Sequence, residues 1–239
     1  MVATKDEVEK HRNLYREMAF KGDYQWENLT RKCYEFDLWY NKVRNEISLE
    51  MLNKVCGGKE ILSIGSRGRV ETELLEQLQT DKITRIDIIG DVDNNIIEAN
   101  AEDMPFQDNS FDVVICRDVI EHVLDDAKAF DEIYRVLNPR GYLLITTPNA
   151  YNYPPDGTCH IRGFSPKGLL ATLSNRKYAI IDKRGDVPNT VSILLTLARM
   201  GLSLLLDEFK EIYSYVKCNP NSYYTGTFLY VLARKAEAW

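Results

Sequence analysis

The sequence predicts an α/β fold built on a seven-stranded, mostly parallel sheet with helices on both faces. From Lys59 onward, short apolar runs alternate with longer amphipathic segments. Consecutive strand–helix–strand units produce this alternation, because parallel neighbours need a crossover helix between them. The composition, 44% hydrophobic and 28% charged over 239 residues, is that of one globular domain with additions.

The N-terminal region has a different, purely helical pattern. Residues 4–57 are expected to form two or three helices, the clearest with apolar residues at helical spacing from Tyr34 to Val55. Gly57 and Gly58 are expected to cap its C-terminus. We therefore predict an N-terminal helical extension over residues 1–58 and one α/β domain over residues 59–239.

The expected strands of the α/β domain lie at 60–64, 83–88, 96–99, 111–116, 141–147, 178–182 and 227–233. The expected helices lie at 70–79, 127–137 and 165–173. About 40 residues separate the last two strands, too many for a hairpin, so we predict a helical insertion at about 187–223. Its apolar helix at 190–206 and a second at 207–217 are expected to cover an acceptor pocket or to form a dimer contact.

Charge and cysteine usage exclude several classes of function. A formal net charge of −6 disfavours nucleic-acid binding and favours a small polar partner. The polar N-terminus lacks a signal-peptide pattern, and no apolar run approaches the roughly 18 residues of a membrane helix. A cytoplasmic protein without membrane contact is therefore expected. Five cysteines without a CxxC pair and three unclustered histidines predict neither disulfides nor a metal site.

A glycine turn and an acid predict a ligand site. The motif ILSIGSRGR places Gly65 at the end of the first strand, where the backbone can approach a ligand closely. Asp87 closes the second strand and could accept hydrogen bonds from a ribose diol. The spacing of Gly65 and Gly68 departs from the dinucleotide GxGxxG pattern. These residues predict a nucleotide-containing ligand and leave its identity open.

Residues 99–149 resemble the central part of the small-molecule class I S-adenosylmethionine-dependent methyltransferases (type 11-like). That family runs roughly D-A-x-D-L-P-F-x-D-N-S-F-D-V-V, then L-E-H-V, then E-x-x-R-V-L-K-P-G-G. The matching positions here are Ala101, Asp103, Pro105, Phe106, 108–114, 121–123, Glu132, 135–137, Pro139 and Gly141. With the glycine turn and Asp87, the resemblance covers about residues 59–148.

The resemblance implies a Rossmann-like fold, S-adenosylmethionine as cofactor, and methyl transfer to an oxygen or nitrogen of a small polar metabolite. Nucleotide-linked sugars and secondary metabolites are candidate acceptors. Carried over by position, it implies cofactor contacts at the methionine part, the ribose and the adenine. The implied cofactor residues are Gly65, Ser66, Arg67, Asp87, Ile88, Asn100, Ala101, Glu102, Cys116, Arg117 and His122.

Two departures from the family motif affect the glycine turn. The family reads D/E-x-G-x-G-x-G, whereas this chain has Ser63 in place of the acid and Arg67 and Arg69 in place of two glycines. We expect Arg67 to point into solvent. Weakened cofactor binding, or use of an acidic derivative of S-adenosylmethionine, stays open.

The acceptor side is expected on the loop at 148–165, beyond the fifth strand. His160 is the candidate general base, since an imidazole accepts a proton at neutral pH, and Asp118 is the second candidate. Alternatively, His160 only fixes the loop by bonding a backbone carbonyl. Tyr151, Tyr153 and Arg162 are candidates for binding the acceptor.

Two other functions stay open at this point. One is a catalytically silent binding or scaffold protein, which the altered glycine turn favours. The other is a nicotinamide-dependent oxidoreductase, against which the glycine spacing and the match over 99–149 both argue. The N-terminal helices and the insertion are plausible surfaces for a homodimer.

Overall fold

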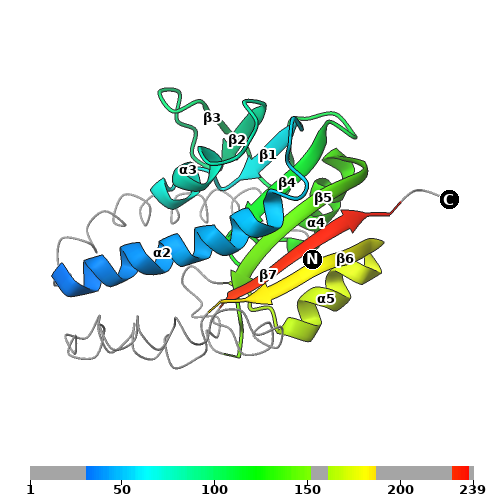
Figure 1. Cartoon of the computed structure of the whole chain (residues 1–239). Coiled ribbons are helices and arrows are strands. Elements are labelled where there is room, and N and C mark those ends of the chain that lie inside the picture. The colour runs from blue at the N-terminus through cyan, green and yellow to red at the C-terminus, as the bar shows by residue number, and fades with distance from the viewer. Residues whose placement is uncertain (1–30, 152–160, 187–227, 237–239) are drawn as a thin grey trace.

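A seven-stranded sheet forms the centre of the computed structural model, which describes residues 31–151, 161–186 and 228–236 (Figure 1). The strand order is β3-β2-β1-β4-β5-β7-β6. The first five strands pair in parallel, and β7 runs antiparallel to both β5 and β6. The mostly parallel sheet is thus confirmed. The strands are β1 (Ile61–Ile64), β2 (Ile83–Asp87), β3 (Ile96–Glu98), β4 (Phe111–Arg117), β5 (Leu137–Pro148), β6 (Tyr178–Gly185) and β7 (Phe228–Lys235).

Helices cover both faces of the sheet, as predicted. The helices are α2 (Arg31–Leu52), α3 (Arg69–Leu75), α4 (Asp126–Val136) and α5 (Pro166–Asn175). Along β4, Val113 and Ile115 pack in one apolar cluster with residues of α2 and α3. Val114 and Cys116 pack in the other cluster, with residues of α4 and α5. Because side chains alternate along a strand, β4 is buried on both faces, as is usual for a central parallel strand.

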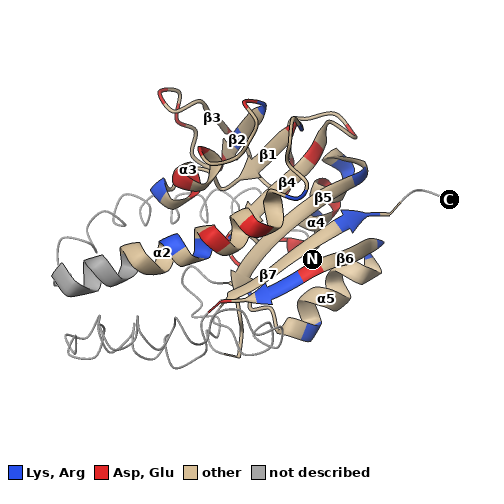
Figure 2. Ribbon diagram, in the orientation of Figure 1, with Lys and Arg blue, Asp and Glu red and all other residues tan. Residues whose placement is uncertain are grey.

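Charged residues are kept away from the middle of this sheet. β1 carries none, and β4 carries them only at or next to its two ends (Figure 2).

The residues that precede two of the helices explain where these helices begin. Ser165 accepts a hydrogen bond from Gly168 N at 3.1 Å and precedes a proline, a combination that favours a helix start. Asp125 caps α4 in the same way through Lys128 N at 3.1 Å.

Several predicted boundaries are wrong. Helix α2 ends at Leu52, and Cys56 N donates to Leu52 O at 2.9 Å in the turn that follows, so Gly57 and Gly58 do not cap the helix. The apolar pattern runs past the helix end because Val55, in that turn, packs against the same apolar cluster as Met51 and Leu52. β5 begins at Leu137, earlier than predicted, since Leu137 pairs with Phe111. The insertion at 187–223 and residues 4–30 lie outside the described residues.

In the described part of the chain, no helix combines the length and apolar character needed to cross a membrane. The described part of the extension is instead packed on the sheet. Met51 and Leu52 of α2 are fully buried in the cluster that contains Ile61 and Val113. Helix α2 thus shares a core with the α/β domain.

Replacement of Met51 by alanine tests this shared core. We expect Met51→Ala to lower the free energy of unfolding by about 2–5 kcal/mol, because the buried side chain leaves a cavity. Lys42→Ala, at an exposed position of the same helix, should change it by no more than about 0.5 kcal/mol. Urea unfolding followed by circular dichroism measures both. Equal, small effects of the two substitutions would mean that α2 is not part of the cooperative unit.

Candidate functional site

The candidate site lies at the carboxyl ends of β1, β2 and β4, where parallel sheets commonly bind ligands. Gly65 follows β1, Asp87 ends β2, and Arg117 ends β4. The strand order reverses here, because β1 lies between β2 and β4. Two cavities open along this edge, and both are lined by Gly65 and Asp87. The two cavities therefore adjoin at these two residues, and together they are called the crevice below.

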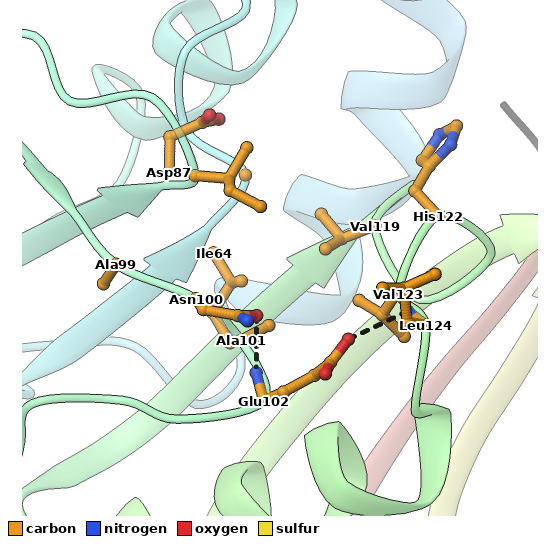
Figure 3. A pocket seen from close by; sticks show the side chains of 12 residues that line it. Ile64, Asp87, Ala99, Asn100, Ala101, Glu102, Val119, His122, Val123 and Leu124 are labelled. Atoms are coloured by element: carbon orange, nitrogen blue, oxygen red, sulfur yellow. Dashed lines mark hydrogen bonds between the residues drawn. The ribbon is translucent and has the colours of Figure 1, made fainter. Parts of the chain in front are cut away.

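The first cavity is mainly apolar and has a volume of about 600 Å³ when the solvent at its mouth is counted. Figure 3 shows Asp87 at one end and His122, Val123 and Leu124 at the other. Twelve residues line it: Ile64, Gly65, Asp87, Ile88, Ala99, Asn100, Ala101, Glu102, Val119, His122, Val123 and Leu124.

Asp87 is held by backbone hydrogen bonds where the two cavities adjoin. Its side chain accepts hydrogen bonds from Arg67 N at 3.3 Å and Ile89 N at 3.1 Å. Burial raises the pKa of Asp87, although these backbone donors and the Arg67 charge oppose the rise. A carboxylate has about four lone-pair sites, so Asp87 retains capacity to accept from a ligand diol.

Asn100 and Glu102 shape the far wall of the first cavity. The Asn100 Oδ1 accepts from Glu102 N at 3.0 Å, and Glu102 Oε1 accepts from Leu124 N at 2.8 Å (Figure 3). Glu102 thereby ties the turn at 99–102 to the segment that follows β4. The side-chain oxygen of Asn100 has a second lone pair that can accept a hydrogen bond from a ligand. The Glu102 carboxylate instead holds the cavity wall together through its bond to Leu124 N.

The second cavity is charged and larger, about 1190 Å³ with its solvent. Helix α2 contributes Asn41 and Arg44, and the turn after β1 contributes Arg67 and Glu71. The full lining is Asn41, Arg44, Gly65, Arg67, Gly68, Arg69, Val70, Glu71, Asp87, Arg117 and Asp118. The crevice therefore has an apolar half and a charged half that meet at Asp87.

A buried polar cluster forms the base of the second cavity. The Ser63 hydroxyl donates to Glu71 Oε1 at 2.9 Å, and Ser66 donates to the Ser63 oxygen at 2.6 Å. Arg117 pairs with Glu71 Oε2 at 3.0 Å and donates to Asn45 Oδ1 at 3.0 Å. Burial raises the pKa of Glu71, while Arg117 and Ser63 oppose the rise. Neither Glu71 nor Asn45 was identified from the sequence, because neither lies in a family motif.

A second polar network holds Asp118. Arg44 of α2 forms an ion pair with Asp118, and Thr146 donates to Asp118 Oδ1 at 2.7 Å. Burial favours a higher pKa for Asp118, but the charges of Arg44 and Arg117 outweigh it and lower the pKa. Burial and the neighbouring Asp118 raise the pKa of Glu121 well above its usual range. Arg44 and Glu121 were given no role from the sequence.

The structure brings together most of the sequence-predicted cofactor residues, with two exceptions. Cys116 is buried in the apolar core, and Ser66 is fully buried beside Ser63; neither is among the residues that line these two cavities. The expectation that Arg67 points into solvent is wrong, since its side chain is half-buried and lines the second cavity. Arg69 is exposed and pairs with Glu73 at 2.6 Å.

The predicted acceptor residues are only partly described. His160 and Tyr153 lie outside the described residues. Tyr151 is 72% exposed, and Arg162 pairs with Asp126 at 2.9 Å and donates to Leu124 O at 2.8 Å. Within the described ranges, no group of three histidine, cysteine or acidic residues is placed to hold a metal ion.

Comparison with known proteins agrees with this geometry. A family model described as a methyltransferase domain matches residues 62–145, from β1 to β5. A Mycolicibacterium smegmatis protein named "Probable S-adenosylmethionine-dependent methyltransferase" is 28% identical over 145 residues, 57% of this chain and 56% of that protein. The Haemophilus ducreyi ubiquinone/menaquinone biosynthesis C-methyltransferase UbiE is 37% identical over 87 residues, 34% of this chain and 32% of that protein. The chain thus spans between about a third and just over half of these relatives.

A solved structure extends the likeness in fold to almost the whole chain. The Burkholderia thailandensis 1,6-didemethyltoxoflavin-N1-methyltransferase, bound to 1,6-didemethyltoxoflavin and S-adenosylhomocysteine, has a TM-score of 0.62 at 15% identity. The match covers 99% of this chain and 92% of that chain. Residues 62–145 thus match a methyltransferase domain, and the chain has a Rossmann-like fold similar to that of S-adenosylmethionine-dependent methyltransferases.

Proposed function

We propose that this chain transfers a methyl group from S-adenosylmethionine to an oxygen or nitrogen of a small polar metabolite. The observation that carries the proposal is the two-part crevice, with an apolar half and a charged half meeting at Asp87. The cofactor has the same division, because a flat adenine and a charged methionine part flank its ribose. When bound, it supplies an electrophilic methyl group on a sulfonium.

The residues of the first cavity fit an adenosine. Asp87 would accept from the ribose hydroxyls, and Asn100 and Ala101 would meet the edge of the adenine. Gly65 has φ +76°, and a Cβ there would lie 2.3 Å from a Val119 methyl carbon. Only glycine therefore allows the backbone to form this junction between the cavities.

Methyl transfer depends mainly on aligning the acceptor and excluding water. A hydroxyl acceptor also needs a base. Asp118 is poorly suited, because its pKa is lowered and Arg44 and Thr146 already bind it. We therefore propose His160 as the base. Its neighbour Ile161 donates to Glu121 O at 2.9 Å, beside His122 of the first cavity, which supports this assignment.

The acceptor is proposed to enter from the charged half of the crevice, with Tyr151, Tyr153 and Arg162 near its path. Nucleotide-linked sugars and secondary metabolites would suit a charged cavity. The insertion at about 187–223 is proposed to cover this region. The flanking residues support this, since Phe228 N donates to Asp186 at 2.9 Å and the Arg44 guanidinium stacks on the Phe228 ring at 3.8 Å.

A second candidate function is binding without catalysis. The departures at Ser63, Arg67 and Arg69 favour it, because they alter the turn that class I methyltransferases use for the cofactor. The two functions differ in a simple assay. A catalyst releases S-adenosylhomocysteine in the presence of an acceptor, whereas a silent protein binds the cofactor and leaves it unchanged.

Substitution of Asp87 tests the cofactor site. Asp87→Ala should weaken S-adenosylhomocysteine binding by about ten- to a hundredfold, because a charge-assisted pair of hydrogen bonds is worth about 1.5–3 kcal/mol. Asn100→Ala should cost less, since only a neutral contact is lost. Asp81→Ala is the matched control, at an exposed position beyond the opposite end of β2. Isothermal titration calorimetry in which Asp87→Ala binds like the parent would remove the ribose assignment.

Substitution of His160 tests the proposed base. With a hydroxyl acceptor found by screening for release of S-adenosylhomocysteine, His160→Ala should lower turnover by about a hundredfold or more. Cofactor affinity should stay near that of the parent. His11→Ala is the control for loss of an imidazole elsewhere. If turnover survives in His160→Ala, or if cofactor binding is the main loss, the base is another group.

A further inference from the structure

We propose that the methyl acceptor is an amine, whose nitrogen is bound by the carboxylate of Asp118 in the second cavity. The inference rests on the proposed function and narrows its acceptor from oxygen or nitrogen to nitrogen. In this role Asp118 takes no proton. It holds an N–H group of the acceptor and stabilises the positive charge that develops on the nitrogen.

The backbone of Asp118 turns its side chain into the second cavity. Along β4, Val113 and Ile115 pack with residues of α2 and α3, and Cys116 packs with residues of α4 and α5. Regular alternation would therefore put the next even position on the side of α4 and α5. Instead Asp118 has φ +55°, lines the second cavity and pairs with Arg44 of α2. This left-handed conformation is uncommon for a residue with a side chain, and such residues cluster at functional sites.

Asp118 is the most accessible member of the two ion pairs in this cavity. Its side chain is 31% exposed, whereas that of Arg44 is 9% exposed. In the other pair, the side chain of Arg117 is 3% exposed and that of Glu71 is 9% exposed. Both guanidinium groups are thus more covered than the carboxylates that they bind. At this end of β4, a ligand in the cavity therefore meets the Asp118 carboxylate, which suits an N–H group and opposes an anion.

The neighbours of Asp118 keep it ionised and leave it room to bind. The charges of Arg44 and Arg117 lower its pKa against the effect of burial. Thr146 donates to Asp118 Oδ1 at 2.7 Å, and Arg44 binds Oδ2. Each carboxylate oxygen has two lone pairs, so the group can also accept from a ligand. A carboxylate with a low pKa is a poor base for a hydroxyl, but a fixed negative charge stabilises positive charge that develops beside it.

Transfer to an amine creates positive charge where Asp118 can stabilise it. An ammonium first loses its proton to water. The lone pair of the neutral amine then attacks the methyl carbon, and the electrons of the carbon–sulfur bond pass to sulfur, which gives S-adenosylhomocysteine. The nitrogen gains the methyl group and the positive charge. No base acts during the transfer, so the requirement for Asp118 is independent of His160.

Three probes that share one ring test the preference: benzylamine, benzyl alcohol and benzoate. Their binding to the full chain saturated with S-adenosylhomocysteine is measured by ligand-observed nuclear magnetic resonance. Benzylamine should bind about tenfold more tightly than benzyl alcohol, the scale of a hydrogen bond to a charged group, and benzoate should bind least. Asp118→Asn keeps the size of the side chain and a residue type tolerated at positive φ, and it should bind benzylamine and benzyl alcohol alike. Asp81→Asn removes an exposed carboxylate beyond the opposite end of β2 and should keep the preference.

Substitution of Arg44 gives a second measurement, which holds even if Asp118→Asn folds poorly. In Arg44→Met the loss of the guanidinium raises the pKa of Asp118, so part of the carboxylate becomes protonated as the pH falls. The ratio of parent to variant affinity for benzylamine should therefore rise several-fold from about pH 8 to about pH 5. Both proteins share the other titratable and charged groups around Asp118, so the ratio reports on Asp118 itself. These groups are Glu71 of α3, Cys116 and Arg117 of β4, Glu121 after β4 and Tyr230 of β7.

Several outcomes would overturn the proposal while the proposed function stands. They are equal binding of benzylamine and benzyl alcohol by the parent, tighter binding of benzoate, the parent preference in Asp118→Asn, or a ratio for Arg44→Met that does not change with pH. If S-adenosylhomocysteine does not bind the parent, the proposed function itself fails.

Discussion

The burial of β4 on both faces is the constraint on which the site depends. Alternate side chains of β4 pack against helices on the two faces of the sheet. Charged side chains are therefore found only at or next to the ends of this strand. Arg117 and Asp118 occupy that end, level with Gly65 after β1 and with Asp87 at the end of β2. The charged residues of β4 that face the crevice consequently lie at the carboxyl edge of the sheet. Together with residues of α2, α3 and the turn after β1, they give the second cavity three carboxylates and four guanidinium groups.

Helix α2 completes this edge from outside the domain that the family motifs define. Arg44 binds Asp118 and also donates to the Tyr230 hydroxyl at 3.2 Å, so one side chain links the helix to β4 and β7. Asn45 holds Arg117 from the same helix. Met51, seven residues after Arg44 and therefore on the same side of the helix, packs in the apolar cluster against the sheet. The helix therefore acts as a wall of the crevice as well as a cover for the sheet.

The sequence predicted the fold well because its strands are short apolar runs separated by clear turns, and local pattern is enough for these. Gly65, Asp87, Asn100 and Ala101 were placed on one cavity by motif. Glu71 and Arg44 were missed because their partners lie 46 and 74 residues away, and no local pattern encodes such pairs. Arg67 was misplaced for a related reason. An arginine at a position where the family has glycine suggested a side chain exposed to solvent. The burial of Arg67 depends instead on residues of α2 and β2 that lie beside it in the second cavity.

The antiparallel pairing of β6 and β7 has an architectural consequence. Because β6 runs parallel to β5, the chain leaves the sheet after Gly185 at the crevice edge and re-enters it at Phe228 on the same edge. Asp186 and Phe228 are joined by a hydrogen bond of 2.9 Å, so the two ends of the intervening segment are already closed. The entropy of closing a longer segment grows only slowly with its length. The number of residues between Asp186 and Phe228 can therefore change at little cost to the pairing of the sheet.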